Sequence, residues 1–353
     1  MRKDRVLAGA LAAVTALSMT ACGGGQAGGT TQAAAAGTQA AVENTANPNA
    51  ETTLSIGYTT AANADDPYHF TATKFKEIVE EKSEGRIAVN LYASSQLGSE
   101  PEMWEGMQTG TCDMAVMTNA YVSSYVPANG ALDLPFIFSD LAQAREIVDG
   151  DFGQSLIDNM DGTGVTCLAF SEGGFRQLCT KDKEIKAPSD LNGLKIRCME
   201  NQVHMDAFSA LGMDPTPMAW SEVFTALQQG VIDGQENPIA VIYSNAVYEA
   251  QDYLAITNHV YSPSMILFSK PVFEGLDPAY QTALLEAAQE AAAYERSACE
   301  DSEAEQIAEM EAAGLEVTYP DTTEFQAAMA PVYEKYADQF GQENIDAIVN
   351  FEY

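Results

Sequence analysis

Two arginines lie on apolar segments of the chain, where a cation needs a specific partner. Arg176 directly follows Phe175, and Arg197 directly follows Ile196, with further apolar residues on either side. An unpaired charge in such surroundings is costly, so each guanidinium needs an anionic partner or a water-filled cleft. The sequence spacing alone does not distinguish two explanations for these arginines: internal salt bridges, or a cleft that binds an anion.

The remaining arginines beyond residue 22 stand in more polar surroundings. Arg86 is next to a glycine that is typical of a helix end, and Arg145 and Arg296 fall on polar faces of expected helices. We expect these three side chains to be solvated, which sets Arg176 and Arg197 apart.

Motifs for catalysis and metal binding are missing from the sequence. There is no HExxH, GxSxG, P-loop or GxGxxG after a strand, and His69, His204 and His259 are too scattered to be metal ligands. We therefore expect no metal, no cofactor and no enzymatic activity. A secreted lyase or hydrolase that uses cleft carboxylates as acid and base remains a rival.

The charge balance excludes further classes of protein. The chain has 51 Asp and Glu against 17 Lys and Arg, a formal net charge of -34. Such a field opposes binding to nucleic acid or to anionic lipid surfaces. A hydrophobic fraction of 46% is ordinary for a globular protein. The length suggests two domains.

The N-terminus indicates export. Residues 1–22 combine a basic start with an apolar run of about 21 Å, too short to span a bilayer, and end in MTAC followed by three glycines. This pattern is typical of a lipoprotein signal peptide with a lipobox, and Cys22 is the expected lipidation site. An ordinary cleaved signal with an incidental cysteine is the alternative. Residues 23–52 are small and polar, which predicts a flexible tether.

Five cysteines remain once Cys22 is set aside. Their number is odd, so at least one thiol stays free. A bridge between Cys167 and Cys179 on neighbouring strands is conceivable, but no CxxC or Cys/His cluster is present. We expect buried thiols in apolar surroundings.

Alternating strands and helices must position the arginines. Periodicity predicts an α/β protein with a parallel or mixed sheet. The expected strands cover residues 53–58, 87–91, 112–117, 165–170, 176–180 and 195–198, and the expected helices 71–84, 101–110 and 221–229. Residues 279–313 contain no Gly or Pro after an Asp-Pro start, which predicts one helix of about 52 Å that could brace two lobes. A break within it is the alternative.

Several motifs in a fixed order resemble the DctP-type family, the extracytoplasmic solute receptors of tripartite ATP-independent periplasmic (TRAP) transporters. The similarity runs from about Leu54 to the C-terminus. Its segments are SQLG at 95–98, DLPF at 133–136, GFR at 174–176, GLKIR at 193–197, PTPMAWSEVFTALQQG at 215–230 and DGQENP at 233–238.

The resemblance implies a two-domain, periplasmic-binding-protein-like (type II) fold. A ligand cleft lies between the lobes, and a long C-terminal helix braces both. We expect lobe I to contain residues 53–174 plus about 263–302, and lobe II residues 175–262 plus about 303–353.

Site residues follow from the same motifs. Arg197 is similar to the arginine that pairs bidentately with the ligand carboxylate, Arg176 to the second cation, and Asn237 to an amide that orients the carboxylate. Trp220 matches an aromatic position against the ligand, with packing in the core as its alternative. Five polar residues are expected in loops after strands and complete the set: Tyr58, His69, Glu100, Asn119 and Glu172. His204 is expected on the helix that follows Arg197 and could also contact the ligand.

The resemblance implies a monomeric receptor that delivers a small organic acid to TRAP membrane subunits. The protein would be lipid-anchored on the outer face of a bacterial cell membrane, or periplasmic, and uptake would use an ion gradient. A receptor for an ATP-driven or other tripartite importer is the nearest rival. The ligand is left as a sugar acid such as a uronate, or a C4-dicarboxylate.

Overall fold

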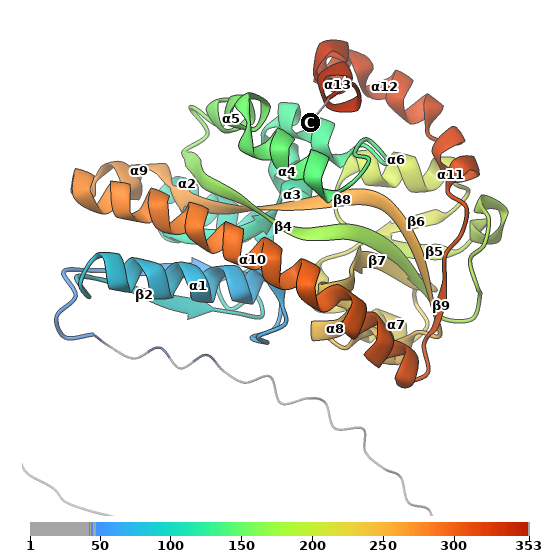
Figure 1. The fold of residues 1–353 in the computed structure, drawn as a ribbon, viewed down its shortest axis with the longest axis horizontal. Coiled ribbons are helices and arrows are strands. Elements are labelled where there is room, and N and C mark those ends of the chain that lie inside the picture. Colours follow the sequence, from blue (N-terminus) through green and yellow to red (C-terminus); the bar gives the residue numbers. More distant parts are fainter. Residues whose placement is uncertain (1–41, 43, 45–46, 352–353) are drawn as a thin grey trace, which may run out of the picture. The chain divides into compact units, whose positions relative to one another are not determined.

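A nine-stranded mixed sheet forms the centre of the fold (Figure 1). The computed structural model describes Val42, Asn44 and residues 47–351, which fall within one compact unit. The expected signal peptide, Cys22 and almost all of the expected tether lie outside the described residues. Along the sheet the order is β2-β1-β3-β8-β4-β7-β5-β6, and β9 pairs with β8.

The two ends of the sheet are parallel and its middle is antiparallel. β1 pairs in parallel with β2 and β3, and β5 pairs in parallel with β6 and β7. Between these groups β4 and β8 pair with each other, with β7 and with β3 in antiparallel fashion, while the short β9 pairs with β8 in parallel. The strands are β1 Thr52–Gly57, β2 Ile87–Tyr92, β3 Met114–Thr118, β4 Val165–Thr180, β5 Lys195–Cys198, β6 Asp214–Pro217, β7 Gly234–Pro238, β8 Tyr253–Ser269 and β9 Glu316–Thr318.

Two exceptionally long strands connect the ends of the sheet. β4 has 16 residues and β8 has 17, and Figure 1 shows them running side by side through the molecule. The prediction of separate strands at 165–170 and 176–180 was wrong. The pairing shifts register between Glu172 and Phe175, where Gly174 has a φ of 91°. Glycine permits this bulge, so the strand bends and continues.

Helices cover the sheet. They are α1 Pro67–Lys82, α2 Glu100–Thr109, α3 Asn119–Tyr125, α4 Leu141–Asp149, α5 Asp151–Asp158, α6 Gln202–Ala210, α7 Trp220–Gln228, α8 Ile239–Ser244, α9 Lys270–Glu274, α10 Pro278–Ala312, α11 Thr323–Ala327, α12 Ala330–Phe340 and α13 Gln342–Val349. Short 3₁₀ turns are η1 Pro127–Asp133, η2 Pro188–Leu191 and η3 Val247–Ala250. None of the helices in the described part of the chain is long and apolar enough to cross a membrane.

The long helix α10 confirms the prediction of a continuous element. The Asp277 side chain caps it by accepting from the amide of Ala279, and Pro278 occupies its first turn. α10 packs on α1, on β4 and on α8, so it contacts elements from both ends of the sheet (Figure 1). Small residues such as Ala287, Ala288 and Ala291 are fully buried, which allows the close approach.

The cysteines are unpaired throughout the described residues. Cys112, Cys167, Cys179 and Cys198 are buried, and Cys299 is half-buried. Cys167 and Cys179 both lie on β4. Twelve positions along one strand separate them by about 40 Å, which excludes the conceivable bridge. The prediction of buried thiols is confirmed for four of the five.

Candidate functional site

Arg197 lies in the middle of the short strand β5, where the sheet holds it beside Thr216 of β6 and Gln235 of β7. Its side chain is 2% exposed. Nε and Nη2 donate to the carbonyl oxygen of Met218 at 3.0 and 2.7 Å. The indole of Trp220 lies over the guanidinium at 5.6 Å, within cation–π range. Trp220 itself is half-buried and also packs on two apolar clusters of the core.

Arg197 has no carboxylate within ion-pair distance among the described residues. Burial lowers its pKa, but an arginine still stays charged at neutral pH. The carbonyl of Met218 is a neutral acceptor and cannot balance the charge. Within the described part of the chain, this side chain is therefore a buried cation with no carboxylate at ion-pair distance.

Arg176 differs because its counter-ion belongs to the protein. From β4 it forms an ion pair through Nε with Glu236 of β7, and Nη2 also donates to Glu236 Oε1 at 2.9 Å and to the Glu236 carbonyl at 2.6 Å. Burial alone would lower the pKa of Arg176, but the Glu236 carboxylate raises it. The internal salt bridge left open by the sequence thus exists for Arg176.

Asn237 joins the same network. Its Oδ1 accepts from Arg176 Nη2 at 3.0 Å, and its Nδ2 donates to Gln235 Oε1 at 2.6 Å. Asn237 is 6% exposed and lies within β7, next to Glu236. The amide is therefore close to the arginine cluster and held in a fixed orientation.

Glu100 approaches the arginines from the other end of the sheet. It is the first residue of α2, and its Oε1 accepts from the amide of Thr118 at 2.9 Å. Burial raises the pKa of Glu100 to about 8, against the opposing effects of the Thr118 amide, Arg197 and Arg176. Both guanidinium groups thus lie close enough to influence this carboxyl electrostatically.

Asn119 is buried near this region, but its amide has internal partners. As the first residue of α3 it donates from Nδ2 to the Asn129 carbonyl at 3.0 Å and to Asp133 Oδ1 at 2.9 Å. Asn201, at the start of α6, donates to Asp133 Oδ2 at 3.0 Å and to the Ala120 carbonyl at 2.8 Å. Asn119 therefore helps to connect α3, η1 and the segment that follows β5.

Four site residues expected in loops lie in regular elements, and for them that prediction was wrong. Glu100 and Asn119 begin α2 and α3, and the other two are His69 and Glu172. His69 belongs to α1, where its Nδ1 bonds to the hydroxyl of Tyr58 at 2.5 Å, and burial lowers its pKa. Glu172 lies inside β4 at 1% exposure. Tyr58, by contrast, directly follows β1 as expected.

The Glu172 side chain bonds to a residue of a helix that covers the sheet. Arg145 of α4 pairs with it through two nitrogens, at 3.1 and 2.5 Å, and Tyr261 donates to it at 2.9 Å. Arg296 of α10 in turn pairs with Asp149 and donates to the carbonyl of Phe170 at 2.9 Å. The prediction that Arg145 and Arg296 are solvated was therefore wrong, while Arg86 is exposed as expected.

Two members of the cluster were not assigned a role from the sequence. Glu236 is fully buried between Arg176 and His259, whose Nε2 lies 3.2 Å from Oε2. Burial alone would raise the pKa of Glu236, but Arg176 and His259 hold this pKa well below its usual range. The available signal was an acidic residue inside the QENP strand, since a central strand position rarely takes an unpaired carboxylate.

The prediction that His204 lies on the helix after β5 is confirmed. It lies in α6 and is 1% exposed, and neither ring nitrogen has a hydrogen-bond partner among the described residues. Burial lowers its pKa to about 3, so the ring is neutral.

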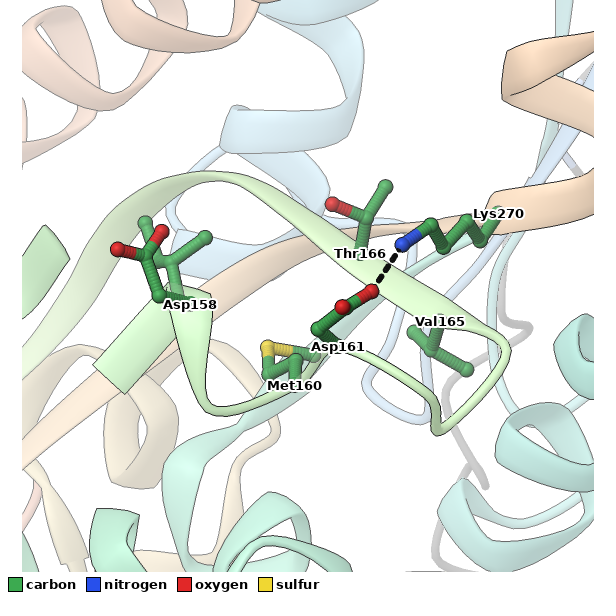
Figure 2. Close-up of a pocket in the computed structure, with 7 residues that line it drawn as sticks. Asp158, Met160, Asp161, Val165, Thr166 and Lys270 are labelled. Carbon is green, nitrogen blue, oxygen red and sulfur yellow. Dashed lines mark hydrogen bonds and ion pairs between the residues drawn. The ribbon is translucent and has the colours of Figure 1, made fainter. Parts of the chain in front are cut away.

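Two surface pockets lie away from this cluster. One, of about 320 Å³, is lined by Asp158, Asp161, Thr166 and Lys270, and Figure 2 shows the ion pair between Lys270 and Asp161 across it. The other, of about 410 Å³, lies between Tyr248 and Leu315. Neither contains an expected site residue, so the buried cluster around Arg197 is the better candidate for chemistry.

Comparison with known proteins gives a consistent result. A model of the DctP family, described as bacterial extracellular solute-binding protein, family 7, matches residues 58–339. A solute-binding protein of Verminephrobacter eiseniae is 40% identical over 300 residues, covering 85% of this chain and 89% of the relative. The 2,3-diketo-L-gulonate-binding periplasmic protein YiaO of Escherichia coli is 36% identical over 264 residues, covering 75% and 80%.

A solved structure shares the fold. The TRAP periplasmic solute-binding protein of Polaromonas sp. JS666, bound to D-erythronate, superposes with a TM-score of 0.83 at 40% identity. The match covers 86% of this chain and 99% of that one. The α/β architecture predicted from the sequence is thereby confirmed.

Proposed function

The chain belongs to the DctP family of bacterial extracellular solute-binding proteins, and from this premise we propose that it captures a small organic acid outside the cytoplasm for a TRAP transporter. The receptor delivers its ligand to the membrane subunits, which use an ion gradient for uptake. A sugar acid and a C4-dicarboxylate both fit this general role. Related proteins are named for binding diketogulonate and erythronate, which are organic acids.

Arg197 carries the proposal, because it is a buried guanidinium whose charge no described carboxylate balances. Met218 fixes Nε and Nη2, and thereby the plane of the group. A ligand carboxylate supplies the missing counter-ion, and charge-assisted hydrogen bonds of this kind are about twice as strong as neutral ones. Trp220 packs against the same guanidinium and forms one wall of the site.

Neighbouring groups orient the ligand. Asn237 and Glu100 lie at the cluster from opposite ends of the sheet, and Arg176 positions Asn237 through its bond to Oδ1. His69 and Asn119 are assigned to the same site from the sequence, and their side chains are held by Tyr58 and Asp133. Because no step needs a covalent intermediate, binding and release constitute the whole mechanism.

Closure of two lobes accompanies capture. Hydrogen bonds join residues of the expected lobe I to residues of the expected lobe II: Asn245 Nδ2 donates to Asp66 Oδ2 at 2.9 Å, and Asn245 Oδ1 accepts from the Ala61 amide at 3.1 Å. Asn201 bonds to Ala120 in the same way. A ligand held by both lobes favours the arrangement in which these bonds exist.

The N-terminal sequence supports an anchored receptor. Acylation of Cys22 would attach the protein to the outer face of the membrane, and the residues between Cys22 and Asn44 would tether the binding unit at a distance. The tether would end at Asn44, because the Asn44 side chain is bonded to the Leu91 backbone and Thr52 already belongs to β1. This arrangement keeps a soluble binding unit near its membrane partners.

A melting-temperature screen tests the proposed function. The protein is scanned with aldonates, uronates, C4-dicarboxylates, and neutral sugars of equal length as controls. A ligand that binds only the native state raises the melting temperature. At a ligand concentration of 100 times Kd, it increases the free energy of unfolding by about 2.7 kcal/mol. The proposal predicts shifts with acids and none with neutral sugars. Shifts with neutral sugars alone, or turnover of an acid on incubation, would contradict it.

A further inference from the structure

The imidazole of His204 is a buried polar group to which the described part of the chain offers no hydrogen bond. The side chain is 1% exposed, and both Nδ1 and Nε2 lack a partner among the described residues. The backbone is fixed, because Asn201 Oδ1 accepts from the His204 amide at 3.0 Å. An unsatisfied buried polar group costs about 1–3 kcal/mol, so its presence calls for a function other than stability.

His204 lies at the edge of the arginine cluster. Its ring stacks on Phe208 at 6.1 Å, and Phe208 contacts His259, the partner of Glu236. Besides the burial that lowers it, the pKa of His204 is raised by the carboxylate of Glu236 and lowered by the guanidinium groups of Arg176 and Arg197, as expected for a ring in this position. Because the ring is neutral, it offers one N–H donor and one acceptor nitrogen. This is the pairing that a hydroxyl group satisfies.

The charge balance of the cluster favours the binding of one negative charge. Arg176 is neutralised by Glu236, whereas Arg197 has no carboxylate at ion-pair distance among the residues that the structure describes. Glu100 and Asp133 add buried carboxyl groups on the side facing lobe I. None of the described lysines is buried. A second carboxylate on the ligand would therefore meet neutral or acidic groups, and desolvating it without a partner costs several kcal/mol.

We propose that this site selects an organic acid with a single carboxylate and at least one hydroxyl group, with Arg197 binding the carboxylate and His204 the hydroxyl. The inference rests on the proposed function and narrows its ligand to hydroxylated monocarboxylates. His204 is then a specificity-determining residue, and dicarboxylates are rejected by charge.

Calorimetry with matched ligand pairs tests the charge rule. Each pair has the same carbon skeleton and differs in one terminal group: D-erythronate against meso-tartrate, and D-galactonate against galactarate, at pH 7. The monocarboxylate is expected to bind at least 100-fold more tightly in every pair that binds. A dicarboxylate that binds equally or more tightly overturns the inference while leaving an acid receptor intact. Failure of all four acids to bind overturns the inference together with the proposed function.

Substitution of His204 tests the hydroxyl contact. His204→Leu removes both nitrogens at similar volume, and His204→Asn and His204→Gln return an amide near one or the other nitrogen. For the tightest monocarboxylate, we expect His204→Leu to weaken binding at least 30-fold, with an unliganded melting temperature no lower than that of wild type and partial recovery in one amide variant. A loss below threefold overturns the assignment. A loss that accompanies a lower melting temperature, with no recovery in either amide variant, also overturns it.

Discussion

The guanidinium of Arg197 is held by the backbone carbonyl of Met218, through Nε at 3.0 Å and Nη2 at 2.7 Å. A carbonyl fixes the orientation of the group but leaves its positive charge uncompensated. Arg176, by contrast, is fixed by the carboxylate of Glu236. We therefore expect the two arginines to have different roles: Arg197 would bind an external anion, and Arg176 would support the internal structure of the site.

Replacing Arg176 should destabilise the fold. Arg176→Met leaves Glu236 buried without its main partner, and breaking a buried pair from one side costs about 3–5 kcal/mol. Urea unfolding measures this loss. The double variant Arg176→Met/Glu236→Met removes both charges and should recover most of the stability. Equal stability of wild type and the single variant would refute the structural role of the pair.

Stability should fall with rising pH through Glu295 of α10. Its carboxyl is fully buried, accepts from the Glu172 amide at 3.0 Å and from Cys299 Sγ at 3.1 Å, and burial followed by the Glu172 charge raises its pKa to about 8. The folded state thus keeps a proton that the unfolded state releases above about pH 4.5. The free energy of unfolding therefore declines as the pH rises from about 4.5 to about 8.

Glu295→Gln removes this dependence. We expect the variant to match wild type near pH 4.5 and to exceed it by about 5 kcal/mol at pH 9. Urea unfolding at pH 5, 7 and 9 gives the comparison. Glu305→Gln, an exposed site on the same helix, controls for the general loss of negative charge. An equal gain in both variants at pH 9 would contradict a buried, protonated Glu295.

The contact between Asn245 and Asp66 should slow ligand release. Asn245→Ala removes bonds to Asp66 Oδ2 and to the Ala61 amide, each worth about 1 kcal/mol. Stopped-flow measurement should show dissociation roughly tenfold faster with little change in association, because the bonds form after encounter. Asn350→Ala, an exposed site at the end of α13, should behave as wild type. A purely slower association in Asn245→Ala would count against the proposed closure.

Anchoring should depend on Cys22. Cys22→Ser removes the thiol that would be acylated, so the protein should move from the membrane fraction to the soluble fraction of the producing cells. Labelling with a radioactive fatty acid should mark wild type and not the variant. Unchanged fractionation together with no labelling of wild type would exclude the lipobox interpretation.

The elements followed well from the sequence where the signal was local. Asp277, Pro278 and the following run without Gly or Pro predicted α10, and period-two alternation predicted β1 and β2. The division of β4 was wrong because Gly173 and Gly174 act as breakers in sequence but produce a bulge once β8 pairs alongside.

The partners of the arginines could not be predicted, because they come from distant parts of the chain. Arg176 and Arg197 have similar apolar neighbours, yet Glu236 lies beside one and a backbone carbonyl beside the other. Arg145 has a polar helical environment in sequence, but folding brings Glu172 of β4 against it. Such pairings depend on strand register and helix packing, which local periodicity does not encode.

Titration calorimetry of Arg197→Met tests the central assignment most directly. Arg86→Met, which removes an exposed guanidinium, is the matched control. With the tightest acid from the screen, we expect at least a 100-fold loss of affinity in Arg197→Met, wild-type affinity in Arg86→Met, and unliganded melting temperatures close to wild type in both. Affinity within tenfold of wild type in Arg197→Met would contradict the assignment of Arg197 as the carboxylate anchor.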